Sequence, residues 1–188
     1  MKELEERILK DGQILGKDIL KVGSFLNQQV DTDLLKNMAK ETKRLFPEEV
    51  TKILTIEASG IGFACSVAFE YGVPFVFAKK SKTANVSGEV VSATVYSFTH
   101  KVSNVISVPK EYINENDKVL IVDDFLANGE ALVGLISLVE QSNAKVVGCC
   151  VQIEKEYQNG GNTLRDKGYK VVSLASIKDM TSNIIQFN

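Results

Sequence analysis

Two adjacent carboxylates, Asp123 and Asp124, are the residues whose type and spacing most directly suggest chemistry. They follow the apolar run 119–122, which is rich in β-branched side chains and therefore indicates a buried strand. A short turn leads from the carboxylates to Gly129, and from Glu130 onward apolar residues recur near one helical face: Leu132, Val133, Ile136 and Val139. The segment thus predicts a strand, an acidic tip, a glycine-containing loop and a helix.

This arrangement suits a phosphorylated sugar. The ends of parallel strands open into a crevice where ligands bind. The first turn of the following helix offers free N–H groups and the positive end of a dipole, which suit a phosphate, and Gly129 allows the backbone to approach it closely. Adjacent carboxylates cannot bind phosphate, but they can accept hydrogen bonds from a sugar diol or hold Mg²⁺ through water. We therefore expect a ribose 5-phosphate site.

The apolar strand, the Asp-Asp pair and the small-residue loop resemble the phosphoribosyl diphosphate (PRPP) motif of type I phosphoribosyltransferases. The common motif carries Thr or Ser hydroxyls around the glycine, which are replaced here, so backbone N–H groups and the Asn128 amide must bind more of the phosphate. The form DDFLANG resembles the xanthine branch of the family. The resemblance implies a catalytic role for Asp123 and Asp124 and PRPP binding by Ala127, Asn128, Gly129, Glu130 and Ala131. An ordinary strand–turn–helix joint with two solvated acids is the alternative.

Two other turns offer anion-binding groups. The small-residue turn 57–60 lies between an expected strand, 52–56, and an expected helix, 61–71. The family resemblance implies that Ser59 and Gly60 receive the pyrophosphate of PRPP; an ordinary N-cap at Ser59 is compatible with that role. The run FAKKSK resembles the family's basic segment, which implies that Lys79 and Lys80 clamp pyrophosphate, whereas a solvated charged face is the bland alternative.

The base-binding residues rest on resemblance alone. The run LKVGSFLNQQ resembles the hood segment of the xanthine enzymes, which implies that Leu20 and Asn27 contact the base. The amide of Asn27 both donates and accepts, as a purine-dione edge requires, although the residue could merely close a turn. The ending IEK of the expected strand 146–153 resembles the family's, which places Lys155 against the purine; a solvated lysine is the alternative.

Strand and helix patterns alternate along the chain, which predicts an α/β fold with a largely parallel five-stranded sheet flanked by helices. Asp31 is expected to cap a helix that ends near Pro47. Residues 81–100 are expected to form a flap with two short strands that excludes water, in which the sole histidine, His100, is structural. We predict a single phosphoribosyltransferase domain over 1–188, with a small hood from 1–30 and 155–188 and a core over about 31–154.

The composition is that of a globular protein: 188 residues, 44% hydrophobic and 24% charged, with a net charge of −2. The sequence indicates no basic face of the kind that binds nucleic acid. It also contains no apolar run long enough to span a bilayer. The N-terminal pattern is a charged helix rather than a signal peptide, so we expect a cytoplasmic protein. Among three cysteines, Cys149 and Cys150 are neighbours on an expected strand and should point to opposite faces as small buried hydrophobes.

The resemblance implies a glycosyltransferase that joins xanthine to the phosphoribosyl group of PRPP in purine salvage. It also implies Mg²⁺ bound with PRPP, no assigned direct metal ligand, and a homodimer by analogy. Phosphoribosyltransferases for hypoxanthine, guanine or adenine would share the PRPP site. A PRPP-sensing regulator of the same fold is a further alternative, but such regulators carry an added DNA-binding domain with a basic face.

Overall fold

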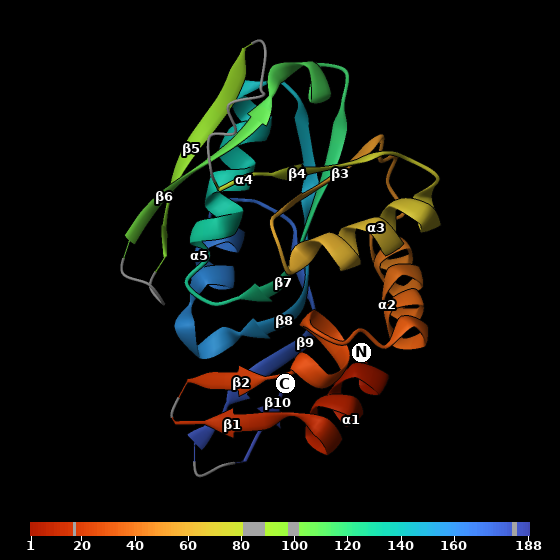
Figure 1. Cartoon of the computed structure of the whole chain (residues 1–188), viewed down its shortest axis with the longest axis vertical. Coiled ribbons are helices and arrows are strands. Elements are labelled where there is room, and N and C mark those ends of the chain that lie inside the picture. Colours follow the sequence, from red (N-terminus) through yellow and green to blue (C-terminus); the bar gives the residue numbers. More distant parts are fainter. Residues whose placement is uncertain (17, 81–88, 98–101, 182–183) are drawn as a thin grey trace.

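The computed structural model describes the chain except for residues 17, 81–88, 98–101 and 182–183 (Figure 1). Its centre is a six-stranded sheet with the strand order β10-β9-β8-β7-β3-β4. The helices are α1 (Lys2–Asp11), α2 (Thr32–Leu45), α3 (Gly60–Tyr71), α4 (Glu130–Gln141) and α5 (Gly160–Asp166). The sheet strands are β3 (Lys52–Ile56), β4 (Phe75–Ala78), β7 (Lys118–Leu126), β8 (Lys145–Lys155), β9 (Val171–Asp179) and β10 (Gln186–Phe187).

Five strands of this sheet run parallel, and β10 adds a two-residue antiparallel edge to β9. The predicted α/β fold with a mostly parallel sheet is confirmed. The sixth strand was not expected, because a two-residue segment has no periodicity that a sequence pattern could reveal. Within the sheet, β7 pairs with both β3 and β8, so its carboxyl end lies at the centre of the strand-end crevice.

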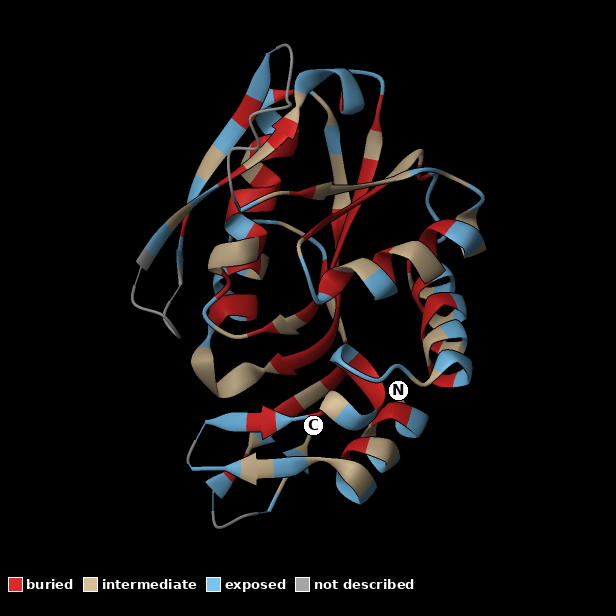
Figure 2. Cartoon of the chain, viewed as in Figure 1, coloured by how far each residue is buried: buried red, intermediate tan, exposed pale blue. Residues whose placement is uncertain are grey.

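Two apolar layers sandwich the sheet, with α2 and α3 on one side and α4 and α5 on the other (Figure 1). Alternate residues of β7 enter opposite layers: Leu120 packs on the α2–α3 side, whereas Ile121 packs on the α4 side. Cys149 and Cys150 divide in the same way, as predicted, and both are fully buried. Burial raises the pKa of each thiol to about 12, so neither forms a thiolate readily. Figure 2 shows the resulting buried interior along the central strands.

A long hairpin of β5 (Val90–Ser97) and β6 (Val102–Pro109) stands on α4. Gly134 makes this close contact possible, because a Cβ there would lie 2.4 Å from Cγ2 of Val95. The strand expected over 105–108 therefore exists but is longer and pairs with β5. Of the flap expected over 81–100, residues 81–88 and 98–100, including His100, lie outside the described residues. A short helix of one turn, Lys110–Tyr112, follows the hairpin.

Residues 1–16 and 18–30 form an N-terminal layer at the end of the molecule where both termini lie (Figure 1), and this layer packs into the same apolar core as α2 and α3. It contains α1, the hairpin of β1 (Gln13–Leu15) and β2 (Ile19–Lys21), and a π-helical turn, Gly23–Asn27. The predicted cap is confirmed, since the Asp31 carboxylate accepts a hydrogen bond from Leu34 N at 3.1 Å. Arg7 holds that same carboxylate at 2.6 Å and lies over the Phe25 ring. No helix in the described part of the chain is long and apolar enough to cross a membrane.

Candidate active site

Asp123 and Asp124 lie near the carboxyl end of the central strand β7 and are largely buried, with 5% and 9% of their surfaces exposed. The apolar run predicts a strand that stops before these acids, and that boundary is wrong. The strand continues to Leu126 because Phe125 pairs with Ile153 of β8. The carboxylates are therefore fixed by strand pairing rather than carried by a turn, which limits the motion of their backbone.

The two carboxylates use one oxygen each on local backbone groups. Asp123 Oδ1 accepts a hydrogen bond from Asp124 N at 3.0 Å, and Asp124 Oδ1 accepts one from Phe125 N at 3.0 Å. Burial raises the pKa of Asp123 well above its ordinary value, and the negative charge of Asp124 raises it further, although Lys80 acts in the opposite direction. A cation or a set of hydroxyl donors in front of the pair would relieve this repulsion.

The loop after β7 presents backbone N–H groups at the start of α4. Gly129 precedes the helix in the left-handed conformation, with φ of 87°, which favours glycine. Within the described residues, no side chain caps this helix N-terminus. The first-turn amides from Glu130 onward are therefore available to an anion, and the helix dipole favours negative charge at the same place.

A second turn faces the acid pair from the end of β3. Ser59 precedes α3, and the peptide bond between Glu57 and Ala58 in this turn is cis. Gly60 is buried against the acids: a Cβ there would lie 2.2 Å from Thr55 Oγ1 and 2.8 Å from Asp123 Oδ1. A residue without a side chain is thus required for α3 to begin so close to the carboxylate.

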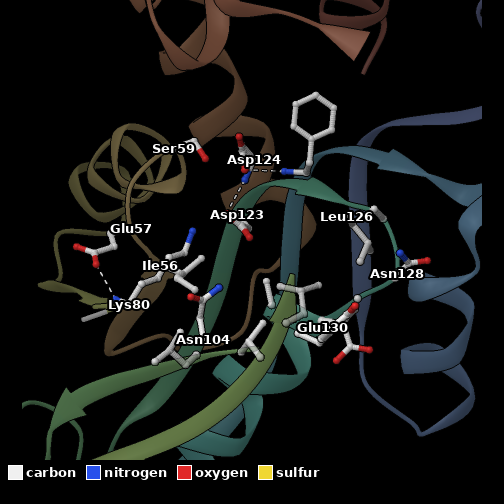
Figure 3. Close-up of a pocket in the computed structure, with 18 residues that line it drawn as sticks. Ile56, Glu57, Ser59, Lys80, Asn104, Asp123, Asp124, Leu126, Asn128 and Glu130 are labelled. Carbon is white, nitrogen blue, oxygen red and sulfur yellow. Dashed lines mark hydrogen bonds between the residues drawn. The ribbon is translucent and has the colours of Figure 1, made fainter. Parts of the chain in front are cut away.

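These segments line one cleft of about 530 Å³ (Figure 3). It brings together most of the PRPP-site residues indicated by the sequence: Ser59, Lys80, Asp123, Asp124, Ala127, Asn128, Gly129, Glu130 and Ala131. Glu57, which the sequence placed in the turn 57–60 without a role of its own, also lines the cleft, as does Asn104, which the sequence did not indicate. Glu57 accepts a hydrogen bond from the backbone N–H of Lys80 at 2.6 Å and so joins the second turn to β4. Only the pairing of β5 with β6 places Asn104 at the cleft, and no local pattern signals it.

Leu20 and Asn27 line a different pocket of about 290 Å³ in the N-terminal layer. Leu20 is 6% exposed and belongs mainly to the apolar core. Asn27 lies between the two pockets, because its Nδ2 donates to Asp124 Oδ2 at 3.4 Å. The structure thus connects the expected base-binding segment to the acid pair through one side-chain contact.

Lys155 and Lys79, unlike the acid pair, are not among the residues that line the cleft. The Lys155 ammonium donates to the backbone oxygen of Asp18 in the β1–β2 turn and lies 5.7 Å from the centre of the Phe125 ring. Burial lowers the pKa of Lys155. Lys79 does not line the cleft. Its backbone instead bridges to Ser107, with N–O distances of 3.0 Å in both directions, and so joins β4 to the hairpin.

The described residues contain no cluster of three His, Cys, Asp or Glu side chains that could enclose a metal ion. Two neighbouring carboxylates nevertheless match what Mg²⁺ uses when a phosphorylated substrate supplies its other ligands, because this ion keeps several waters and needs only one or two protein carboxylates. The donor set therefore fits Mg²⁺ carried by a diphosphate, rather than a metal held by the protein alone.

Residues 22–188 match the family model described as the phosphoribosyl transferase domain. The chain is 49% identical over 188 residues to the xanthine phosphoribosyltransferase of Ruminiclostridium cellulolyticum, covering 100% of this chain and 99% of the relative. It is 50% identical to the xanthine phosphoribosyltransferase of Clostridium novyi with the same coverage. The corresponding protein of Latilactobacillus sakei is 51% identical over 178 residues, covering 94% of this chain and 91% of the relative.

Solved structures support the same fold at lower identity. Adenine phosphoribosyltransferase of Giardia lamblia, complexed with 9-deazaadenine, superposes with a TM-score of 0.78 at 22% identity, covering 92% of this chain and 97% of that chain. The Trypanosoma brucei adenine phosphoribosyl transferase, in complex with AMP, pyrophosphate and ribose-5-phosphate, gives a TM-score of 0.77 at 17% identity, covering 92% and 79%. At these identities the similarity establishes the shared fold.

Proposed function

Because the chain belongs to the type I phosphoribosyltransferase family, we propose that it transfers the 5-phosphoribosyl group of PRPP to xanthine, giving xanthosine 5′-monophosphate and pyrophosphate. The reaction is that of a glycosyltransferase in purine salvage. The observation that carries the proposal is a single cleft in which the Asp123–Asp124 pair lies between two turns that can bind anions. The full-length similarity to xanthine phosphoribosyltransferases supports the choice of base.

The acid pair binds the ribose in this mechanism. Asp124 and Asp123 accept hydrogen bonds from the ribose hydroxyls, and their negative charge stabilises the positive charge that develops at the anomeric carbon. The first-turn amides of α4 and the loop 127–129 bind the 5-phosphate, with the Asn128 side chain in reach because it also lines the cleft. The sugar is thereby held at both ends.

The opposite turn receives the leaving group. Ser59 and Gly60 at the start of α3 offer backbone groups to pyrophosphate, and Lys80 supplies positive charge from the end of β4. Lys79 has its backbone fixed by Ser107, and its proposed contact with pyrophosphate is made across a homodimer interface. These contacts orient the diphosphate for displacement by the base.

Much of the rate enhancement is attributed to positioning and shielding, because the displacement needs no covalent enzyme intermediate. The β5–β6 hairpin contributes Val95, Tyr96, Asn104 and Ile106 to the cleft wall. Such a wall limits the entry of water, which would otherwise compete with the base for the anomeric carbon.

Mg²⁺ bound with PRPP supplies neutralisation of charge on the departing diphosphate. Asp123 and Asp124 would hold it, through water, from the ribose side. Their mutual repulsion, which raises the pKa of Asp123, falls when a divalent cation or hydroxyl donors face them.

The base lies between the acid pair and the N-terminal layer. Asn27, which reaches Asp124, offers an amide to the purine-dione edge, while Leu20 lines the neighbouring pocket. Lys155, at the end of β8, lies 5.7 Å from the ring centre of Phe125, which lines the cleft, and its ammonium holds the β1–β2 turn. The proposed enzyme acts in the cytoplasm as a homodimer.

A base-specificity assay tests the proposal. The purified chain is incubated with PRPP, MgCl₂ and xanthine, guanine, hypoxanthine or adenine, and nucleotide formation is measured for each base. We expect the highest kcat/KM for xanthine. A higher kcat/KM for another base would assign the chain to a sister enzyme, and PRPP binding without turnover of any base would indicate a regulator; either result contradicts the proposal.

A further inference from the structure

The loop that faces the proposed 5-phosphate position, residues 127–129, is in direct backbone contact with a distant segment. Gly160, the first residue of α5, donates its N–H to the Ala127 carbonyl at 3.1 Å. A Cβ at Gly160 would lie 2.3 Å from Ala127 O and 2.5 Å from both Asn128 C and Gly129 N. The contact is reciprocal, because a Cβ at Gly129 would lie 3.3 Å from Gly160 Cα. The two backbones can therefore touch only because Gly160 lacks a side chain, and a side chain at Gly129 would tighten the same contact.

The segment behind this contact is itself anchored to β8. Glu154, only 1% exposed, receives both arms of the Arg165 guanidinium, at 2.9 and 2.6 Å. Arg165 also donates to Val171 O at 3.1 Å, so the ion pair joins α5 to β9 as well. Gly161 fits against this pair without spare room, since a Cβ there would lie 1.9 Å from Glu154 Oε1. The buried Gly160–Gly161 pair is thus held between a paired carboxylate and the loop 127–129.

Neither glycine is explained by the backbone conformation of α5. Ala is more favourable than Gly inside a helix by about 1 kcal/mol, so two successive glycines would weaken so short a helix without a compensating reason. The close approach to the loop provides the reason at Gly160, and the approach to Glu154 provides it at Gly161. Glycine is therefore required at these two positions because other groups approach the backbone closely, and not because the segment has to be flexible.

We infer that Gly160 is a positioning residue for the 5-phosphate of the sugar substrate: it sets the shape of the loop 127–129 by backbone contact and transmits to it the rigidity of the Glu154–Arg165 pair. The inference rests on the proposed function, since it names what shapes that function's phosphate site. Gly160 itself touches no substrate. A methyl group at this position displaces the loop and misaligns the amides that receive the phosphate.

The test compares the binding of two ligands that each represent one part of PRPP. Binding of ribose 5-phosphate and of magnesium pyrophosphate is measured separately by calorimetry for the wild-type chain and Gly160→Ala. We expect ribose 5-phosphate to bind on the order of tenfold more weakly to the variant, because small displacements at such sites carry large penalties. Pyrophosphate binds at the Ser59 turn and should keep its affinity. In steady-state assays KM for PRPP should rise while KM for xanthine changes little.

A matched control separates this effect from general destabilisation. Gly148 lies near the other end of β8, and a Cβ there would lie 2.5 Å from Phe46 Cε1 and 2.8 Å from Lys170 O. Gly148→Ala therefore introduces a similar clash away from the loop. We expect it to lower Tm while the ratio of the ribose 5-phosphate and pyrophosphate affinities stays at the wild-type value.

The inference would be overturned if Gly160→Ala bound both ligands more weakly by the same factor, or if its affinity for ribose 5-phosphate were unchanged. If Gly160→Ala does not fold, Arg165→Lys decides: it keeps the charge but loses the two-armed contact with Glu154, and it should weaken ribose 5-phosphate selectively, whereas an unchanged affinity overturns the inference. Failure of the wild-type chain to bind ribose 5-phosphate at all would instead contradict the proposed function.

Discussion

The two sides of the cleft are built in different ways. The sugar and phosphate side consists of strand ends and helix starts of the central sheet, with Asp123 and Asp124 within a paired strand and Gly129 and Gly160 in backbone contact. The base side consists of a short hairpin and a π-helical turn, which pack on the sheet through the apolar core and reach the acid pair through the Asn27 side chain. We therefore expect the proposed PRPP site to follow from the fold, whereas the proposed base recognition depends on a few side chains that sequence change can alter.

The largest expected effect concerns the sugar and phosphate side of the cleft. Asp124→Asn removes a negative charge beside the anomeric carbon, so kcat should fall by about 10²–10³-fold, the magnitude typical for loss of a group that stabilises transition-state charge. The substitution keeps the shape and relieves repulsion with Asp123, so Tm should not fall. Steady-state kinetics and thermal unfolding measure both quantities.

The exposed Asp166 on α5 provides the control, since Asp166→Asn changes the same charge away from the cleft. Its kcat should equal that of the wild type. If Asp124→Asn retained most of the activity, the acid pair would have no catalytic role and the comparison between the two sides would lose its basis.

A smaller effect is expected at the junction of the two sides. Lys155→Met keeps an apolar stem beside Phe125 but removes the ammonium that holds the Asp18 carbonyl. We expect KM for xanthine to rise by about tenfold, the equivalent of roughly 1.4 kcal/mol, with KM for PRPP nearly unchanged. Kinetics with each substrate varied in turn measure the split, and an equal rise in both constants would show that Lys155 supports the whole cleft.

On the base side, Asn27→Ala removes the amide that approaches Asp124. We expect discrimination between xanthine and hypoxanthine to fall by about 10-fold, within the range for a lost polar contact to a substrate. Competition between the two bases at fixed PRPP measures this ratio directly. An unchanged ratio accompanied by a fall in kcat would instead place Asn27 with the acid pair.

The smallest effect concerns stability. Burial and the charge of Asp124 raise the pKa of Asp123, so the folded state holds that proton more tightly than the unfolded chain does. The ionised group therefore reduces stability as pH rises through its folded pKa, and no reduction remains below its unfolded pKa. Asp123→Asn should raise Tm at pH 8, by roughly 2–4 °C per kcal/mol gained, and the gain should vanish in acid. A gain independent of pH would contradict this origin.

The structure of the sugar and phosphate side was also easier to predict from sequence than that of the base side. A β-branched run, adjacent acids and a glycine before a helical pattern are all local signals. The helix cap at Asp31 could be predicted as well, because capping is a local interaction. The end of β7 was misplaced, because Phe125 and Leu126 are held by pairing with β8 rather than by their own sequence. Pairing between distant strands has no local signature.

The base side gave weaker signals for the same reason. Leu20 and Asn27 were indicated only by resemblance, and their placement depends on how the N-terminal layer packs on β9 and on Asp124. The sequence assigned no role to Gly160, and only its contact with Ala127 explains why a side chain is excluded there. Asn104 reached the cleft through a hairpin whose register the sequence did not specify.

The central claim is that the β7–α4 segment binds the sugar and its phosphate. A crystal structure of the chain with PRPP or a stable analogue and Mg²⁺ tests it directly. The account predicts ribose hydroxyls within about 3.2 Å of Asp123 or Asp124 and the 5-phosphate at a similar distance from the first amides of α4. A 5-phosphate bound elsewhere, with the amides of 128–131 facing only water, would contradict it.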